Sequence, residues 1–171
     1  MRTYRRVARF LEGLGASIGI AALRLSIGVV YLWFAVPKFF PGISPAEPLV
    51  AETVQKLTLG IIEGTLACVL TGILEVVIGV LMISGRMPSL AIMILLGHMA
   101  GTFTPLILFP KETWDTFGVG TLEGQYILKN LVIVSAALVI IGRGSARKKP
   151  QDRSALAGSP VRASEPTGSR T

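Results

Sequence analysis

The chain has very few of the side chains that bind metals or carry redox chemistry. Its 171 residues include one cysteine, Cys68, and one histidine, His98. A single cysteine excludes an intramolecular disulfide, a CxxC redox pair and a cysteine-rich metal site. A single histidine excludes a haem held by two histidines of the same chain. The glycine-rich fingerprint of dinucleotide-binding proteins is also absent. We therefore predict no metal site, and no haem or dinucleotide site is evident.

Acidic residues are scarce as well, and the charges are unevenly distributed. The chain has 10 acidic and 17 basic residues, which gives a formal net charge of +7. The basic residues concentrate at both ends of the chain and at Arg86, whereas most acidic residues lie in two other connections. This is the positive-inside pattern, which predicts that both termini lie in the cytoplasm. No nucleic-acid recognition motif accompanies the charge. We therefore expect the lipid bilayer as partner, and no nucleic acid.

Apolar sequence is what the chain has in excess. Its mean hydropathy is +0.63, and 51% of its residues are hydrophobic. Crossing a bilayer takes about 20 mostly apolar residues, and four runs qualify: residues 18–40, 66–84, 88–109 and 125–142. Backbone polar groups in hydrocarbon must be satisfied within the segment, so these runs are helices. The sequence predicts an all-α, four-transmembrane-helix bundle in the cytoplasmic (inner) membrane, with both the N- and the C-terminus inside.

The predicted domain organisation is one membrane domain between two basic ends. Residues 1–17 form a basic cytoplasmic lead, and the apolar run that follows is too long for a cleaved signal peptide. Residues 18–142 hold the four spans, with a short helix over residues 49–59 in the first connection. Residues 143–171 are rich in Arg, Ser, Pro and Gly, and almost lack large apolar side chains. We predict that they form a disordered basic cytoplasmic tail.

Polar residues inside the predicted spans are the candidates for function. A carboxylate at bilayer depth costs several kcal/mol, so Glu75 is expected to be paired or functional. Arg24, Glu75 and His98 each share a helix face with small residues, which allow helices to approach closely. Depths estimated at about 1.5 Å per residue bring the three together as one buried polar cluster. Two simpler interpretations stay open: a structural Arg24–Glu75 pair that fixes helix register, and a hydrogen-bonded core histidine.

A second polar cluster is predicted near the outer surface. It comprises Lys38, Lys129, Asn130 and Glu123. The simpler interpretation of Lys38 is that its side chain extends to the membrane interface. Tyr31 shares one helix face with Arg24, Gly28, Ala35 and Lys38, and the small residues mark this face as interior. Aromatic residues of the spans are otherwise expected mostly at lipid or at the interface.

Three stretches of the sequence together resemble a known family. Residues 24–34 read RLSIGVVYLWF and are followed by Lys38 and Phe39; residues 72–79 read GILEVVIG; residues 123–137, after Trp114, read EGQYILKNLVIVSAA. They resemble the DoxX-like superfamily of small four-helix membrane proteins, and most closely its YkgB/RclC-type branch. Asn130 stands where that branch usually has an acid, so the resemblance does not support the ion pair expected at that position.

The resemblance implies an accessory subunit of a membrane redox system, quinone-linked, or of an oxidative-stress-resistance system. A quinone is the candidate ligand, with hydrogen bonds from Arg24 and His98, and the cofactor is otherwise unknown. Redox partner subunits would supply the electrons, and a homo-oligomer stays open. The alternatives are a small-solute or proton pathway through Glu75 and His98, and a non-catalytic membrane scaffold. The sequence does not establish whether the chain is an enzyme.

Overall fold

A computed structural model of the chain describes residues 1–157, with the side chains of residue 1 and of residues 3–143. The chain divides into two units, Met1–Ile141 and Gly142–Thr171. The apolar core and the cavity described below belong to the first unit. Its helical segments are, in chain order, α1 (Arg2–Ala35), η1 (Val36–Phe39), α2 (Glu47–Leu57), α3 (Gly64–Ser84), α4 (Pro88–Phe103), α5 (Pro105–Leu108), α6 (Pro110–Thr113) and the first part of α7 (Leu122–Ala157).

Within the described residues, four helical segments are long and apolar enough to cross a membrane. They are Thr3–Phe39, Gly64–Ser84, Pro88–Leu108 and Leu122–Arg143. The predicted set of four spans is confirmed in these terms, and the chain is a multi-pass, all-α membrane protein. One small element was not predicted: between α6 and α7, β1 (Trp114–Thr116) pairs in antiparallel fashion with β2 (Val119–Gly120).

Glycine and proline determine where several helices end and begin. Gly85 ends α3 with a positive φ of 62°, a left-handed conformation that glycine adopts without steric cost. Pro88 then occupies the first turn of α4, where the missing N–H of proline costs nothing. Pro37 likewise lies in the first turn of η1, which begins at Val36 directly after α1. The residues after Pro37 are therefore held in a tight 3-10 turn at the end of the first span.

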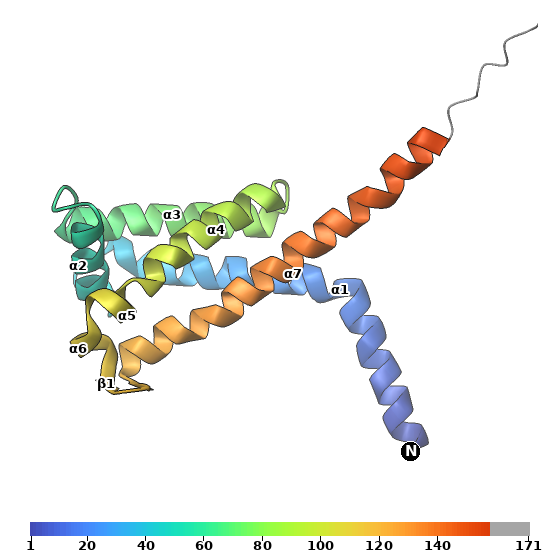
Figure 1. The fold of residues 1–171 in the computed structure, drawn as a ribbon, viewed down its shortest axis with the longest axis horizontal. Helices are drawn as coiled ribbons and strands as arrows, with labels where there is room; N and C mark the ends of the chain where they lie inside the picture. The colour runs from blue at the N-terminus through green and yellow to red at the C-terminus, as the bar shows by residue number, and fades with distance from the viewer. Residues whose placement is uncertain (158–171) are drawn as a thin grey trace, which may run out of the picture. The chain divides into compact units, whose positions relative to one another are not determined.

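The second half of α1 lies alongside α3, and two glycines allow this close contact (Figure 1). A Cβ atom at Gly28 would lie 2.9 Å from the carbonyl oxygen of Gly79, and one at Gly79 would lie 3.0 Å from that of Gly28. A larger side chain at either position would force the helices apart. The glycine contact thus sets the register of α1 against α3, and this register decides which polar residues meet.

The apolar core occupies the half of the first unit that lies nearer the α3–α4 turn. Its fully buried members include Ile78 and Met82 of α3, Ile92 and Leu95 of α4, and Ala137 of α7. In the other half, α2 packs against α3 and the short helices replace long ones. The helix predicted over residues 49–59 is present there as α2. The buried ion pair and the cavity described below lie in this second half.

The chain end differs from the predicted disordered tail in its first part. α7 continues as a helix to Ala157, past the span end predicted at residue 142. The prediction of disorder came from the lack of large apolar residues, which rules out a packed core but not a helix. Ala, Arg and Lys, which make up eight of residues 143–157, are good helix formers. The remaining predicted tail, residues 158–171, lies outside the described residues.

Candidate functional site

A buried ion pair joins the end of the first span to the middle of α3. The Nζ atom of Lys38 lies 2.8 Å from Oε2 and 3.1 Å from Oε1 of Glu75. The two side chains are only 6% and 9% exposed. The same Nζ atom donates to the carbonyl oxygen of Phe34 at 3.0 Å. An ammonium group has three N–H donors, so each of them has an acceptor within this site.

The local structure explains why Lys38 turns inward. α1 ends at Ala35, and its last carbonyl groups have no intrahelical partner. The 3-10 turn η1, which contains Pro37, folds Lys38 back over this helix end, where a cation also interacts favourably with the helix dipole. The α1–α3 register brings Glu75 opposite the same turn. Gly72, about one turn before Glu75 on α3, lies so close to this turn that an added Cβ would be 3.3 Å from the Cβ of Lys38 and 3.4 Å from the carbonyl oxygen of Ala35. Sequence and register together therefore assemble the pair.

His98 of α4 and Tyr31 of α1 extend the polar site. His98 Nε2 lies 3.6 Å from Oε1 of Glu75, and its Nδ1 lies 3.4 Å from the Tyr31 hydroxyl. The two rings meet edge to face, with centroids 5.6 Å apart. A carboxylate only accepts hydrogen bonds, so we assign the ring proton to Nε2, and Nδ1 then accepts from the Tyr31 hydroxyl. Lys38, Glu75, His98 and Tyr31, referred to below as the polar chain, form one connected series.

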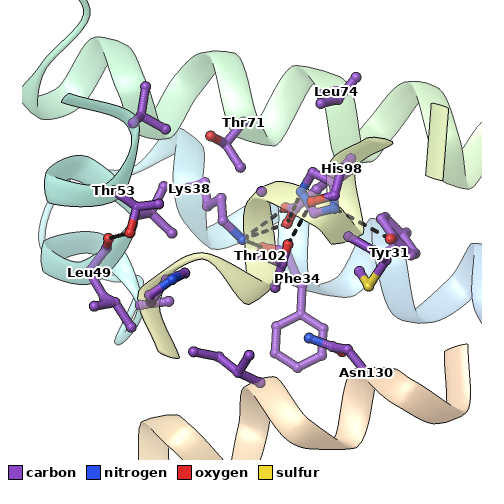
Figure 2. A pocket seen from close by; sticks show the side chains of 18 of the residues that line it. Tyr31, Phe34, Lys38, Leu49, Thr53, Thr71, Leu74, His98, Thr102 and Asn130 are labelled. Atoms are coloured by element: carbon purple, nitrogen blue, oxygen red, sulfur yellow. Dashed lines mark hydrogen bonds and ion pairs between the residues drawn. The ribbon is translucent and has the colours of Figure 1, made fainter. Parts of the chain in front are cut away.

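The polar chain lies at the wall of a cavity of about 440 Å³ (Figure 2). Other lining residues are mainly apolar and come from α1, α2, α3, α4, α5 and α7. The lining side chains of Phe34 and Tyr126 are 51% and 52% exposed, so the cavity extends to the protein surface beside α1 and α7. Ligand sites in proteins typically have such a volume and combine apolar walls with few polar groups.

The predicted inner cluster is only partly right. His98 and Glu75 are neighbours, but Glu75 pairs with Lys38 and not with Arg24. The guanidinium of Arg24 packs against Gly85, and its Nε atom is buried without a hydrogen-bond partner in the described part of the chain. Glu75 lies almost three helical turns before Gly85, roughly 15 Å along α3. The depth estimate failed because α1 and α3 lie in a different register from the one that the predicted span limits implied. The observed register brings Lys38, and not Arg24, level with Glu75.

The predicted outer cluster does not form as a unit. Lys38 belongs to the polar chain, and Asn130 lines the same cavity from α7. Lys129 is exposed, and its Nζ atom lies 4.4 Å from the ring centroid of Tyr126. Glu123 is exposed near the start of α7, and no ion pair joins it to another side chain among residues 3–143.

Two sequence features disagreed about Tyr31. Aromatic residues of the spans were expected mostly at lipid or at the interface, but Tyr31 also shares an interior helix face with Gly28, Ala35 and Lys38, at spacings of three and four. The residue is 4% exposed, so the helix-face interpretation was the right one. Leu49, Thr53 and Leu57 of α2 also share one helix face at spacings of four, but the sequence did not indicate that this face would line a cavity between the spans.

The chain was compared with protein-family models, with curated proteins and with solved structures, and none of the three comparisons finds a match. Among the described residues, no three His, Cys, Asp or Glu side chains are grouped so that they could hold a metal ion. The chemistry that this arrangement itself offers is hydrogen bonding and proton exchange. Its donors and acceptors are the ammonium, carboxylate, imidazole and phenol groups of the polar chain.

Proposed function

We propose that this protein binds an amphipathic ring compound of the quinone type in its cavity, and that it serves a membrane redox or oxidative-stress-resistance system as an accessory subunit. The proposal places it in the cytoplasmic membrane with both termini inside. It rests on one observation above all: four hydrogen-bonding side chains line an otherwise mainly apolar cavity that extends to the surface of a membrane protein. The resemblance to DoxX-like proteins points to the same class of ligand.

The polar chain suits the two oxidation states of such a ligand. A quinone carbonyl needs hydrogen-bond donors, and the donor protons of Lys38, His98 and Tyr31 all point at acceptors within the polar chain or at the Phe34 carbonyl. A ligand oxygen would therefore replace one of these acceptors, and the two longest contacts, Tyr31–His98 at 3.4 Å and His98–Glu75 at 3.6 Å, are the ones it would replace. Reduction of a quinone to a quinol takes up two electrons and two protons. The sequence has no dinucleotide fingerprint and no cysteine pair, so the electrons come from a redox partner subunit. His98 and Tyr31 would exchange the protons at the ligand oxygen.

The cavity itself provides the test. A Cβ atom at Gly101, which lines the cavity, would meet no atom within 4 Å, so Gly101→Leu adds its side chain to open space. We expect this variant to lower binding of a tritiated short-tailed quinone by at least about tenfold in lipid nanodiscs, because the added side chain competes with the ligand for volume. Gly13→Leu is the matched control, because Gly13 also has open space but lies outside the cavity.

Two results would contradict this function. One is the absence of saturable quinone binding by the unmodified protein. The other is unchanged quinone binding by a Gly101→Leu variant whose melting temperature equals that of the unmodified protein. Co-purification of the unmodified protein from native membranes provides the test of the accessory role, in which a redox subunit should accompany it.

A proton pathway is the second candidate, and the connected polar chain favours it. Lys38, Glu75, His98 and Tyr31 follow one another as neighbouring proton-bearing groups inside the membrane domain. Such series occur in proton-conducting membrane proteins. Proteoliposomes loaded with a pH-sensitive dye distinguish the two functions. Proton flux that Glu75→Gln abolishes would favour the pathway, whereas quinone binding without flux would favour the redox role.

A further inference from the structure

Asn130 occupies an unusual position on α7. The residues of α7 that line the cavity, namely Tyr126, Ile127, Asn130 and Ile133, recur along one helix face. The same face continues into the apolar core at Ala137. Asn130 thus places a carboxamide in the middle of the face that α7 turns toward the rest of the first unit.

The Asn130 amide has no hydrogen-bond partner among the side chains and backbone that the structure describes. Figure 2 shows its side chain directed from α7 toward the cavity. The threonine hydroxyls of the lining differ: those of Thr53, Thr71 and Thr102 each donate to a carbonyl one turn earlier in their own helix. The Asn130 side chain is only half-buried, so its amide stays accessible from the cavity. Its donor and acceptor groups are therefore available to a ligand that enters there.

The α4 wall of the cavity has space for a flat ligand. Gly97 and Gly101 flank His98, and a Cβ atom at either would meet nothing within 4 Å. Their spacing resembles a helix-packing motif, but they differ from Gly28 and Gly79, which do contact a neighbouring helix. Without side chains, the two positions leave open volume along α4.

We infer that Asn130 is a specificity-determining residue whose amide binds a second polar group of the ligand. The preferred ligand is then a planar ring with hydrogen-bonding groups on two opposite edges. One group faces the polar chain, and the other faces Asn130. This inference rests on the proposed function, because it takes the same cavity as the binding site. It adds that a single carbonyl is not sufficient for full affinity.

The experiment compares two ligands of the same size in lipid nanodiscs. One is a para-naphthoquinone with two opposite carbonyls, and the other is the bicyclic ketone that retains only one of them. The unmodified protein should bind the diketone roughly threefold to tenfold more tightly, which is the range for one neutral hydrogen bond. Asn130→Leu should lose this difference and bind both compounds with the affinity of the monoketone. Ser135→Leu is the matched control, because it also removes a polar side chain from α7, at an exposed position outside the cavity.

The possible results separate this inference from the function on which it depends. Binding of neither compound by the unmodified protein would contradict the proposed function. Tight binding of the diketone that Asn130→Leu leaves unchanged would overturn only the role of Asn130. Equal loss of both compounds in Asn130→Leu would also overturn it, because the substitution would then have changed the cavity and not one contact. Should Asn130→Leu fail to fold, Asn130→Ala repeats the comparison with a smaller side chain.

Discussion

Replacing Lys38 by methionine should destabilise the protein strongly, because it leaves the Glu75 carboxylate buried without its cation. Methionine retains most of the length of lysine but donates no hydrogen bond. Glu75 would lose contacts of 2.8 and 3.1 Å and keep only His98, whose Nε2 lies 3.6 Å away. Removing one partner of a buried ion pair typically costs about 3–5 kcal/mol of unfolding free energy. With the side chains 6% and 9% exposed, solvent screens this pair little.

The double variant makes this reasoning specific. Lys38→Met with Glu75→Leu removes both charges and leaves mainly the Phe34 carbonyl without its partner, a loss of about 1 kcal/mol. We therefore expect the double variant to be more stable than either single variant, with a coupling free energy of at least about 3 kcal/mol. The assay is reversible unfolding in mixed micelles, followed by circular dichroism. Lys129→Met controls for loss of a cation at an exposed site. Additive effects of the two single substitutions would refute the buried pair.

Two further predictions concern helix packing and topology. Gly79→Ala should destabilise the protein by about 1–3 kcal/mol, because its Cβ would lie 2.8 Å from Leu32 and 3.0 Å from the backbone oxygen of Gly28. Gly97→Ala should instead stabilise the protein by roughly 0.5–1 kcal/mol, because its Cβ would enter open space. Thermal melts in which both variants shift the melting temperature in the same direction would contradict the α1–α3 packing. In a Cys68→Ala background, a membrane-impermeant maleimide applied to intact cells should modify Ile61→Cys and Phe117→Cys, which are 82% and 106% exposed, but not Arg86→Cys. The opposite labelling pattern would reverse the proposed orientation.

The spans could be predicted from the sequence because length and hydropathy alone determine them. Glu75 and His98 could also be singled out, since polar groups at membrane depth are rare. The partner of Glu75 could not, because it depends on the offset between α1 and α3. That offset comes from the contact of Gly28 with Gly79, and neither helix encodes it by itself.

The cavity escaped prediction for a related reason. One of its walls is α2, a short helix whose position depends on its packing against α3. Gly97 and Gly101 had been noted as a weak packing motif, and only the structure shows that they border open space. Asn130 appeared in the sequence as an exception to a family pattern. Its direction toward the cavity follows from the tertiary placement of α7.

The simplest interpretation of the Lys38–Glu75 pair is that it fixes the register of two helices, and the structure provides a reason to doubt that this is its only role. The contact between Gly28 and Gly79 already sets that register without any buried charge. A buried ion pair contributes little net stability, since desolvation offsets the attraction between the charges. This pair also adjoins a cavity, where apolar side chains could have filled the space instead. Hydrogen-bonding groups kept at such a position are best explained by a ligand or a proton that uses them.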